Sequence, residues 1–237
     1  MSIYSKITEA LSPDEANPGR EFKSFEPKTR DKGSFKEFEK ALRKYGLLTL
    51  IIGKRGSGKT ALGMKLLSWY KHNTDRKCYG IGYMEADLPR WIKKTEDIET
   101  IPNNSVVLID EAAILFFSRE SMKSMNKTLS KIMSVARHKN LSLILITQSS
   151  AMVDLNVLRL VDVLLFKEPS LLQERFERQS LRDLFQKVDS IFKDIDRDRE
   201  PYFYVFSDEY EGLVQYDLPY FWNDSISRAF KEFEANE

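Results

Sequence analysis

The chain has 237 residues, which is enough for one α/β domain with a sizeable core and some additional elements. Its 37 Lys and Arg residues nearly balance its 36 Asp and Glu residues, so any surface for nucleic acid must be local. The single cysteine, Cys78, excludes an internal disulfide, and with only two histidines a metal site built from cysteine or histidine is not expected.

The first third of the chain leads into a strand, a loop and a helix. Residues 1–33 are polar and interrupted by prolines, which predicts an extended N-terminal arm. Apolar residues at helical spacing predict a short amphipathic helix over residues 35–45. Residues 47–52 are typical of a buried strand, and residues 61–67 of the first turns of a helix that ends near residue 73.

The segment between that strand and that helix matches a phosphate-binding loop, in which glycine, four variable residues and Gly-Lys-Thr follow one another. Its glycines allow backbone N–H groups to point inward at phosphate oxygens, and the helix N-terminus adds partial positive charge. We expect Lys59 to reach the β- and γ-phosphates of ATP and the Thr60 hydroxyl to bind Mg²⁺. The expected nucleotide-binding residues are Gly53, Lys54, Arg55, Gly56, Ser57, Gly58, Lys59 and Thr60.

The middle of the chain alternates strands with helices. A short strand is expected over residues 79–83, and buried strands over residues 105–110, 141–147 and 161–167. A helix is predicted over residues 119–138, and residues 91–92 lie in a region without a clear assignment. This alternation predicts a mostly parallel sheet covered by helices on both faces.

The last third changes character. Apolar spacing predicts a long amphipathic helix over residues 181–195, followed by a hairpin that pairs residues 202–206 with residues 212–216. A last helix is expected over residues 222–233. The aromatic residues of this part are read as structural, as are Cys78, Trp69 and Trp91.

Two acidic residues end the strand over residues 105–110. Asp110 is expected to bind Mg²⁺, directly or through water, because parallel sheets place their active sites at the carboxyl ends of strands. Glu111 is placed to act as general base for an attacking water. Since a kinase does not need the second acid, the Asp-Glu pair favours nucleotide hydrolysis.

A polar residue also ends the next predicted strand. Gln148 follows Thr147, and adjacent strand ends converge on one ligand site. We expect its side chain to contact the γ-phosphate or the attacking water, the alternative being an ordinary polar residue at the edge of the sheet.

The segment over residues 119–139 contains six basic residues and only one acidic residue. Lys123, Lys127 and Lys131 share one helix face and could follow a DNA backbone, although a plain solvated face is an equal alternative. Arg137 is a candidate arginine finger for the γ-phosphate of a neighbouring subunit. Its alternative role is to pair with the negative end of the helix dipole.

The phosphate loop, the strand ending in Asp110-Glu111 and the run from Ala136 to Gln148 together resemble the FtsK–HerA superfamily of P-loop ATPases. The Arg-His pair, short link, apolar strand and Thr-Gln pattern is the most specific part. The compact size resembles the genome-packaging ATPases of membrane-containing icosahedral viruses, and the ATPase part of zonular-occludens-toxin-like phage assembly proteins is similar. The resemblance covers about residues 46–168.

Members of that superfamily are ring-shaped, usually hexameric, DNA-translocating motors. The resemblance implies a RecA-like α/β fold with a small C-terminal helix and hairpin extension, and ATP and Mg²⁺ as cofactors. It implies ATP-site roles for Lys59, Thr60, Asp110, Glu111 and Gln148, and Arg137 as the finger acting on a neighbour. The toxin-like branch normally carries a membrane-spanning segment. It therefore fits less well, because no apolar run in this sequence approaches the roughly 20 residues that span a bilayer.

The favoured function is therefore an ATPase that drives double-stranded DNA into a viral capsid. The enzyme alternative is a small-molecule or nucleoside kinase, for which Arg175, Arg178 and Arg182 could form a lid. The other alternative is a nucleotide-gated assembly scaffold with negligible turnover. The expected partners are further copies of the chain, double-stranded DNA and a capsid or membrane vertex protein, and the expected location is the host cytoplasm or the virion.

The expected organisation has three parts within one domain. These are an N-terminal arm over residues 1–33, a P-loop ATPase core over residues 34–168 and a C-terminal extension over residues 169–237.

Overall fold

A single mixed sheet organises the molecule. The computed structural model describes residues 22–110, 122–147, 159–169, 179–196, 198–223 and 225–226. Within these residues ten strands form one sheet in the order β1-β10-β9-β8-β3-β7-β6-β4-β5, with β2 also paired to β10.

Six strands form the parallel half of this sheet. Their pairings with one another all run parallel, and β7 lies between β3 and β6. Most of their side chains are buried on both faces, as expected of parallel strands between two helical layers. The six strands are β3 (Leu48–Ile52), β4 (Cys78–Ile81), β5 (Ile92–Thr95), β6 (Val106–Asp110), β7 (Ser142–Thr147) and β8 (Val163–Phe166).

The other half of the sheet is antiparallel and extends it beyond β8. The predicted hairpin is confirmed as β9 (Tyr202–Ser207) and β10 (Tyr210–Gln215), joined by a turn tighter than expected. Strand β9 pairs with β8. Two short strands, β1 (Glu26–Pro27) and β2 (Lys32–Gly33), pair with β10 and were not predicted.

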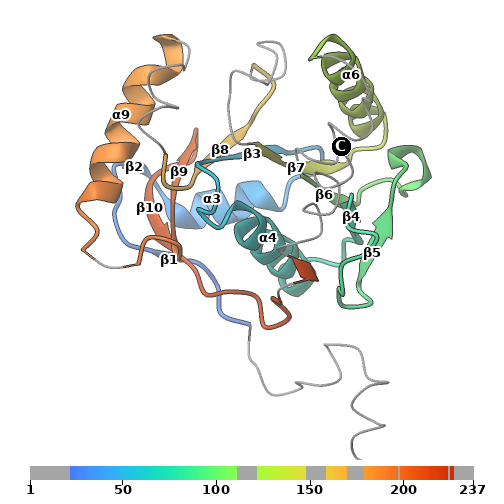
Figure 1. The fold of residues 1–237 in the computed structure, drawn as a ribbon, viewed down its shortest axis with the longest axis horizontal. Helices are drawn as coiled ribbons and strands as arrows, with labels where there is room; N and C mark the ends of the chain where they lie inside the picture. The colour runs from blue at the N-terminus through green and yellow to red at the C-terminus, as the bar shows by residue number, and fades with distance from the viewer. Residues whose placement is uncertain are drawn as a thin grey trace, which may run out of the picture.

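Helices cover both faces of the sheet (Figure 1). On one face, α3 (Phe35–Leu42) and α4 (Lys59–Asn73) share a core with side chains such as Ile51 and Leu108. On the other face, α6 (Met122–His138) and α9 (Gln179–Lys193) pack with side chains such as Leu50 and Val107, together with the short helix η1 (Ile98–Thr100). Because neighbouring residues of a strand point to opposite faces, each buried strand contributes to both cores.

The predicted helices before β3, after the phosphate loop, before β7 and before the hairpin are therefore confirmed within the described residues. The region around residue 92, which had no assignment, contains β5. Most of the predicted helix over residues 222–233 lies outside the described residues, as do residues 119–121.

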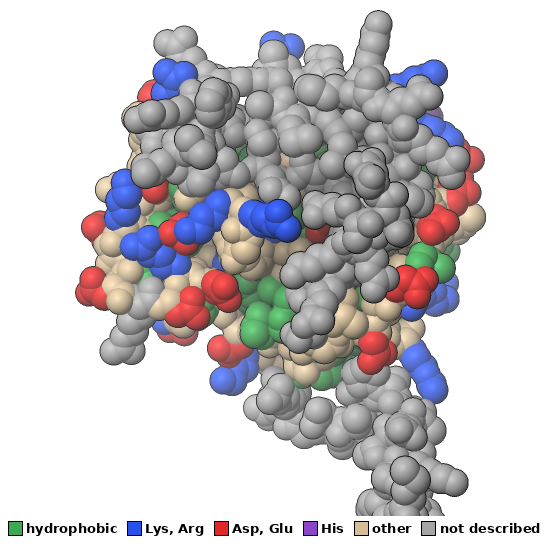
Figure 2. Space-filling view, viewed as in Figure 1, with side chains coloured by type: hydrophobic (Ala, Val, Ile, Leu, Met, Phe, Trp, Pro, Cys, Tyr) green, Lys and Arg blue, Asp and Glu red, His purple; other side chains and the backbone are tan. Residues whose placement is uncertain are grey.

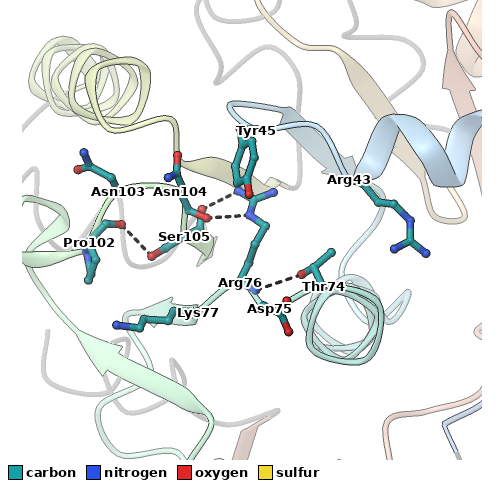
Figure 3. Close-up of a pocket in the computed structure, with 10 residues that line it drawn as sticks. All are labelled: Arg43, Tyr45, Thr74, Asp75, Arg76, Lys77, Pro102, Asn103, Asn104 and Ser105. Atoms are coloured by element: carbon teal, nitrogen blue, oxygen red, sulfur yellow. Dashed lines mark hydrogen bonds between the residues drawn. The ribbon is translucent and has the colours of Figure 1, made fainter.

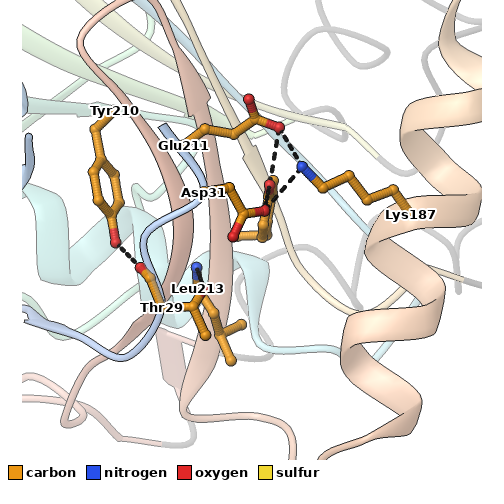
Figure 4. Close-up of polar contacts among 7 residues, drawn as sticks. Thr29, Asp31, Lys187, Tyr210, Glu211 and Leu213 are labelled. Atoms are coloured by element: carbon orange, nitrogen blue, oxygen red, sulfur yellow. Dashed lines mark hydrogen bonds and ion pairs between the residues drawn. The ribbon is translucent and has the colours of Figure 1, made fainter. Parts of the chain in front are cut away.

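A polar cluster fixes the N-terminal segment against the hairpin and α9 (Figure 4). The Lys187 ammonium contacts the carboxylates of Asp31 at 2.8 Å and Glu211 at 2.6 Å, and the Tyr204 hydroxyl lies 2.6 Å from Asp31 and 2.9 Å from Glu211. Nearby, the Tyr210 hydroxyl donates to the Thr29 carbonyl. Segments far apart in the sequence are thus held together by charge-assisted hydrogen bonds.

Candidate nucleotide-binding site

The predicted phosphate loop lies where β3 ends and α4 begins. Gly58 is the N-cap of α4 with φ of 83°, and Gly56 has φ of 75°, so both occupy the left-handed region that favours glycine. A Cβ at Gly53 would lie 2.6 Å from Cβ of Lys167 and 2.9 Å from the Ser57 hydroxyl. The loop therefore needs its first glycine because neighbouring atoms approach so closely.

Lys59 is held over the loop itself. Its Nζ donates to the carbonyls of Gly53 and Lys54, both at 2.9 Å, and its side chain is largely buried. The charge is thus positioned at the loop in advance of any ligand, as electrostatic stabilisation of a phosphate requires.

Ser57 contributes an unused polar group to the same loop. Its hydroxyl is buried and has no hydrogen-bond partner among the described residues. Buried hydroxyls normally find a partner, so this one is available to a bound ligand.

The two predicted magnesium ligands lie together. The Thr60 hydroxyl donates to Oδ2 of Asp110 at 3.2 Å, although 50 positions separate these residues in the chain. Thr60 lies in the first turn of α4, and Asp110 ends β6 at the same edge of the sheet. A hydroxyl and a carboxylate are oxygen donors, which suit Mg²⁺ in a site that leaves room for water and phosphate.

Tyr83 lies beside this pair. Burial, and after it the charge of Asp110, raises the pKa of the Tyr83 hydroxyl well above its usual range. Tyr83 therefore stays protonated beside this carboxylate.

Ion pairs join the loop to the segments after β8 and before β9. Glu168 contacts Lys54 and Arg199, each at 2.7 Å, and its carbonyl accepts from the Lys54 amide at 3.0 Å. Burial alone would raise the pKa of Glu168, but hydrogen bonds from Lys54 and Arg199 and their charges outweigh it and lower the pKa. Arg55, by contrast, is exposed.

Glu111 and Gln148 lie outside the described residues. The strands that precede them end at Asp110 and Thr147, where β6 pairs with β7 and β7 pairs with β3. Their predicted roles as general base and γ-phosphate sensor remain predictions.

Arg137 is not brought to this site within one chain. It lies exposed in the last turn of α6, and the next residues contact the segment before β6, where the Lys139 carbonyl accepts from the Asn104 amide at 2.8 Å. This is the amino edge of the parallel strands, opposite the phosphate loop.

One of the three lysines that share a face of α6, Lys123, Lys127 and Lys131, forms an ion pair. Lys131 pairs with Glu99 at 2.7 Å, while Lys127 is exposed and the side chain of Lys123 lies outside the described residues. Hydrogen bonding to Glu99 raises the pKa of Lys131, so this side chain stays charged.

A recess of about 290 Å³ opens at the amino edge of the sheet, away from the phosphate loop (Figure 3). At its centre, the guanidinium of Arg76 donates to the carbonyls of Lys44, Asn104 and Ser105 at 3.2, 2.8 and 2.9 Å. It also donates to the Ser142 hydroxyl at 2.9 Å. These bonds join the starts of β3, β6 and β7, so Arg76 has a structural role.

Sequence reasoning missed three residues that contact the phosphate loop, Lys167, Glu168 and Tyr216. The signal for Lys167 was present, because it follows an apolar strand as Asp110 does. Nothing local indicates Tyr216, whose place depends on how the hairpin packs.

The strand order and the loop define the class of protein: this is a P-loop NTPase fold with a mostly parallel core. Comparison with solved structures agrees. The genome packaging NTPase B204 from Sulfolobus turreted icosahedral virus 2, in complex with ATPγS, is 13% identical with a TM-score of 0.51, over 75% of this chain and 99% of that one. B204, the DNA-packaging ATPase from Sulfolobus turreted icosahedral virus, is also 13% identical with a TM-score of 0.51, over 74% of this chain and 100% of that one. The expected fold class, and the resemblance to small viral packaging ATPases at the level of fold, are confirmed.

A family model described as Novel STAND NTPase 3 matches residues 31–159, which is more than half of the chain. The chain belongs to this family of NTPases. Comparison with curated protein sequences found no match.

Proposed function

We propose that this NTPase binds ATP with Mg²⁺ and hydrolyses it to ADP and phosphate. The observation that supports this most directly is the 3.2 Å contact between Thr60 and Asp110, beside the positioned ammonium of Lys59. This arrangement supplies a cation for the phosphates and two oxygen ligands for Mg²⁺, as phosphoryl transfer requires.

Each residue then has a separate task. Lys59 and the amides of the loop hold the β- and γ-phosphates, and Ser57 offers a further hydroxyl. Thr60 and Asp110 would hold Mg²⁺, which neutralises charge on the phosphate oxygens when bound. Glu111 takes a proton from the attacking water, and Gln148 orients that water or the γ-phosphate.

Replacing Lys59 and Glu111 separates binding from hydrolysis. Lys59→Ala should lose ATP binding, because it removes the charge at the loop. Glu111→Gln should bind ATP normally but release phosphate at least about 100-fold more slowly, because general-base catalysis is lost. ATP affinity by calorimetry and phosphate release measure the two effects. Wild-type turnover in Glu111→Gln would show that another group is the base.

We further propose that ATP turnover drives double-stranded DNA through a homo-oligomeric ring, most simply a hexamer, and that packaging of viral DNA is the process served. The fold shared with proteins described as genome-packaging NTPases supports this. On the described part of the face in Figure 2, Lys and Arg are intermixed with Asp and Glu, so this face carries no continuous basic track for DNA. Any DNA surface is therefore local.

The alternatives are separated by the same assays. A kinase would need an acceptor, so phosphate release from ATP alone excludes it, and Arg175 and Arg178 of its proposed lid lie outside the described residues. A scaffold would bind ATP without turnover, with or without DNA. Among the described residues no helix is both long and apolar enough to span a bilayer, and contact with a capsid or membrane vertex protein stays a proposal.

A further inference from the structure

A buried lysine lies directly under the phosphate loop. Lys167 follows β8, its amide donates to the Ile52 carbonyl at 2.7 Å, and its side chain is fully buried. If Gly58 carried a Cβ, that atom would lie 3.6 Å from Cε of Lys167. Lys167 therefore spans the underside of the loop from Gly53 to Gly58.

Every donor of this ammonium has an acceptor. Nζ donates to the carbonyls of Glu200 and Tyr202, the latter at 2.6 Å, and lies 3.4 Å from the Tyr216 hydroxyl. An ammonium has three N–H donors, so the three contacts satisfy it. Burying a charge is costly without such partners. An apolar side chain would fill the same space without that cost, so packing alone does not explain a lysine here.

Tyr216 carries this contact on to the loop. Its hydroxyl donates to the Gly58 carbonyl at 3.2 Å, and its ring is buried at the end of β10. Lys167, Tyr216 and Gly58 thus form a chain of hydrogen bonds from the hairpin segment to the N-cap of α4.

This chain helps to hold the direction of one peptide group, whose carbonyl also accepts from the Leu62 amide at 3.0 Å within α4. In a trans peptide the C=O and the following N–H point in opposite directions. Holding the Gly58 carbonyl toward Tyr216 therefore aims the Lys59 amide the other way. That amide is one of the first N–H groups of α4, which are the groups that bind phosphate at a helix N-terminus.

We propose that Lys167 and Tyr216 are positioning residues of the nucleotide site, holding the Gly58–Lys59 peptide in the orientation that receives a phosphate. The inference rests on the proposed binding of ATP by this loop. It assigns the hairpin a role in nucleotide binding.

The charge of Lys167 makes the hydrogen bond from Tyr216 to Gly58 depend on pH, which gives the proposal a second test. Burial lowers the pKa of Lys167 to about 7, against the charges of Glu200, Asp198 and Glu168, and Lys59 adds to the lowering. Burial raises the pKa of Tyr216, so its hydroxyl stays protonated. When Lys167 is charged, it donates to Tyr216 and leaves the hydroxyl proton for Gly58. When it is neutral, its lone pair competes for that proton.

Tyr216→Phe tests the proposal because it removes only the hydroxyl. The affinity for ATPγS with Mg²⁺, measured by calorimetry, should weaken about three- to tenfold, and KM for ATP should rise while kcat is kept. The advantage of wild type over Tyr216→Phe should be larger at pH 6 than at pH 8.5. Ionisation of the nucleotide affects both proteins equally and cancels in this ratio.

Tyr204→Phe is the matched control, since it removes another hydroxyl from the same hairpin, one that bonds to Asp31 and Glu211 and not to the loop. It should lower the melting temperature but leave ATPγS affinity unchanged. Lys167→Met, if it folds, removes the group that competes for the Tyr216 proton, so its advantage over Tyr216→Phe in ATPγS affinity should be the same at pH 6 and at pH 8.5.

Equal ATPγS affinity in wild type and Tyr216→Phe would overturn the positioning role and leave the proposed function intact. Failure of wild type to bind any nucleotide would overturn the proposed function first.

Discussion

Arg137 differs from the other candidate site residues, because it lies at the opposite edge of the sheet from its own phosphate loop. Within one chain it therefore cannot serve the γ-phosphate. Its proposed role needs a neighbour whose nucleotide site faces this edge, as in a ring of head-to-tail subunits.

Mixing variants tests that role. Arg137→Ala should bind ATP normally but hydrolyse it about 1,000-fold more slowly, because a finger stabilises transition-state charge. Mixed with Glu111→Gln, it should recover part of the phosphate release, since some interfaces pair an intact base with an intact finger. His138→Ala, an exposed neighbour on the same helix, is the control and should keep its rate.

If mixed oligomers are confirmed and phosphate release does not recover, Arg137 does not act on the nucleotide of a neighbouring subunit. A wild-type rate per subunit that does not depend on protein concentration would argue against any residue supplied by a neighbour.

At the scale of elements, the cluster of Asp31, Lys187, Tyr204 and Glu211 joins the N-terminal segment, α9 and the hairpin. Burial alone would raise the pKa of Asp31, but hydrogen bonds from Lys187 and Tyr204 and the charge of Lys187 lower it. A carboxyl whose pKa is lowered on folding stabilises the fold above its unfolded pKa of about 3.9. That stability is lost as the pH falls through the lower, folded value.

Asp31→Asn should therefore lower the free energy of unfolding by about 1 kcal/mol at pH 7, as expected for a partly buried pair with hydrogen bonds. The difference from wild type should shrink as the pH falls below about 4. Urea unfolding at each pH measures this. Glu37→Gln, which breaks the exposed pair with Lys40, should change stability by less than about 0.5 kcal/mol. A pH-independent loss in Asp31→Asn would assign the effect to packing.

The same elements show what the sequence could predict. The parallel strands, α4 and the hairpin have strong apolar patterns, and Lys59, Thr60 and Asp110 belong to motifs with a fixed place in this fold. Strands β1 and β2 have two residues each, too short for any periodicity, and exist because they pair with β10. Tyr216 reaches the loop, and Arg199 reaches Glu168, only through packing of the hairpin and the segment before it, which no local pattern encodes.

At the scale of the whole molecule, the antiparallel hairpin extends a parallel nucleotide-binding core and contacts its loop through Tyr216. The division into an arm over residues 1–33, a core over residues 34–168 and an extension over residues 169–237 stays a proposal. In the structure, residues 26–33 and the hairpin belong to the same sheet as the core.

We propose that ATP turnover at this site is coupled to duplex DNA. The most direct test is phosphate release by wild type and by the triple variant Lys123→Gln, Lys127→Gln, Lys131→Gln, over a range of DNA and salt concentrations. Duplex DNA should raise the wild-type rate. The triple variant should need more DNA, with a slope of log affinity against log salt reduced by at most about 3. A wild-type rate that duplex DNA leaves unchanged at low salt would show that turnover is not coupled to DNA.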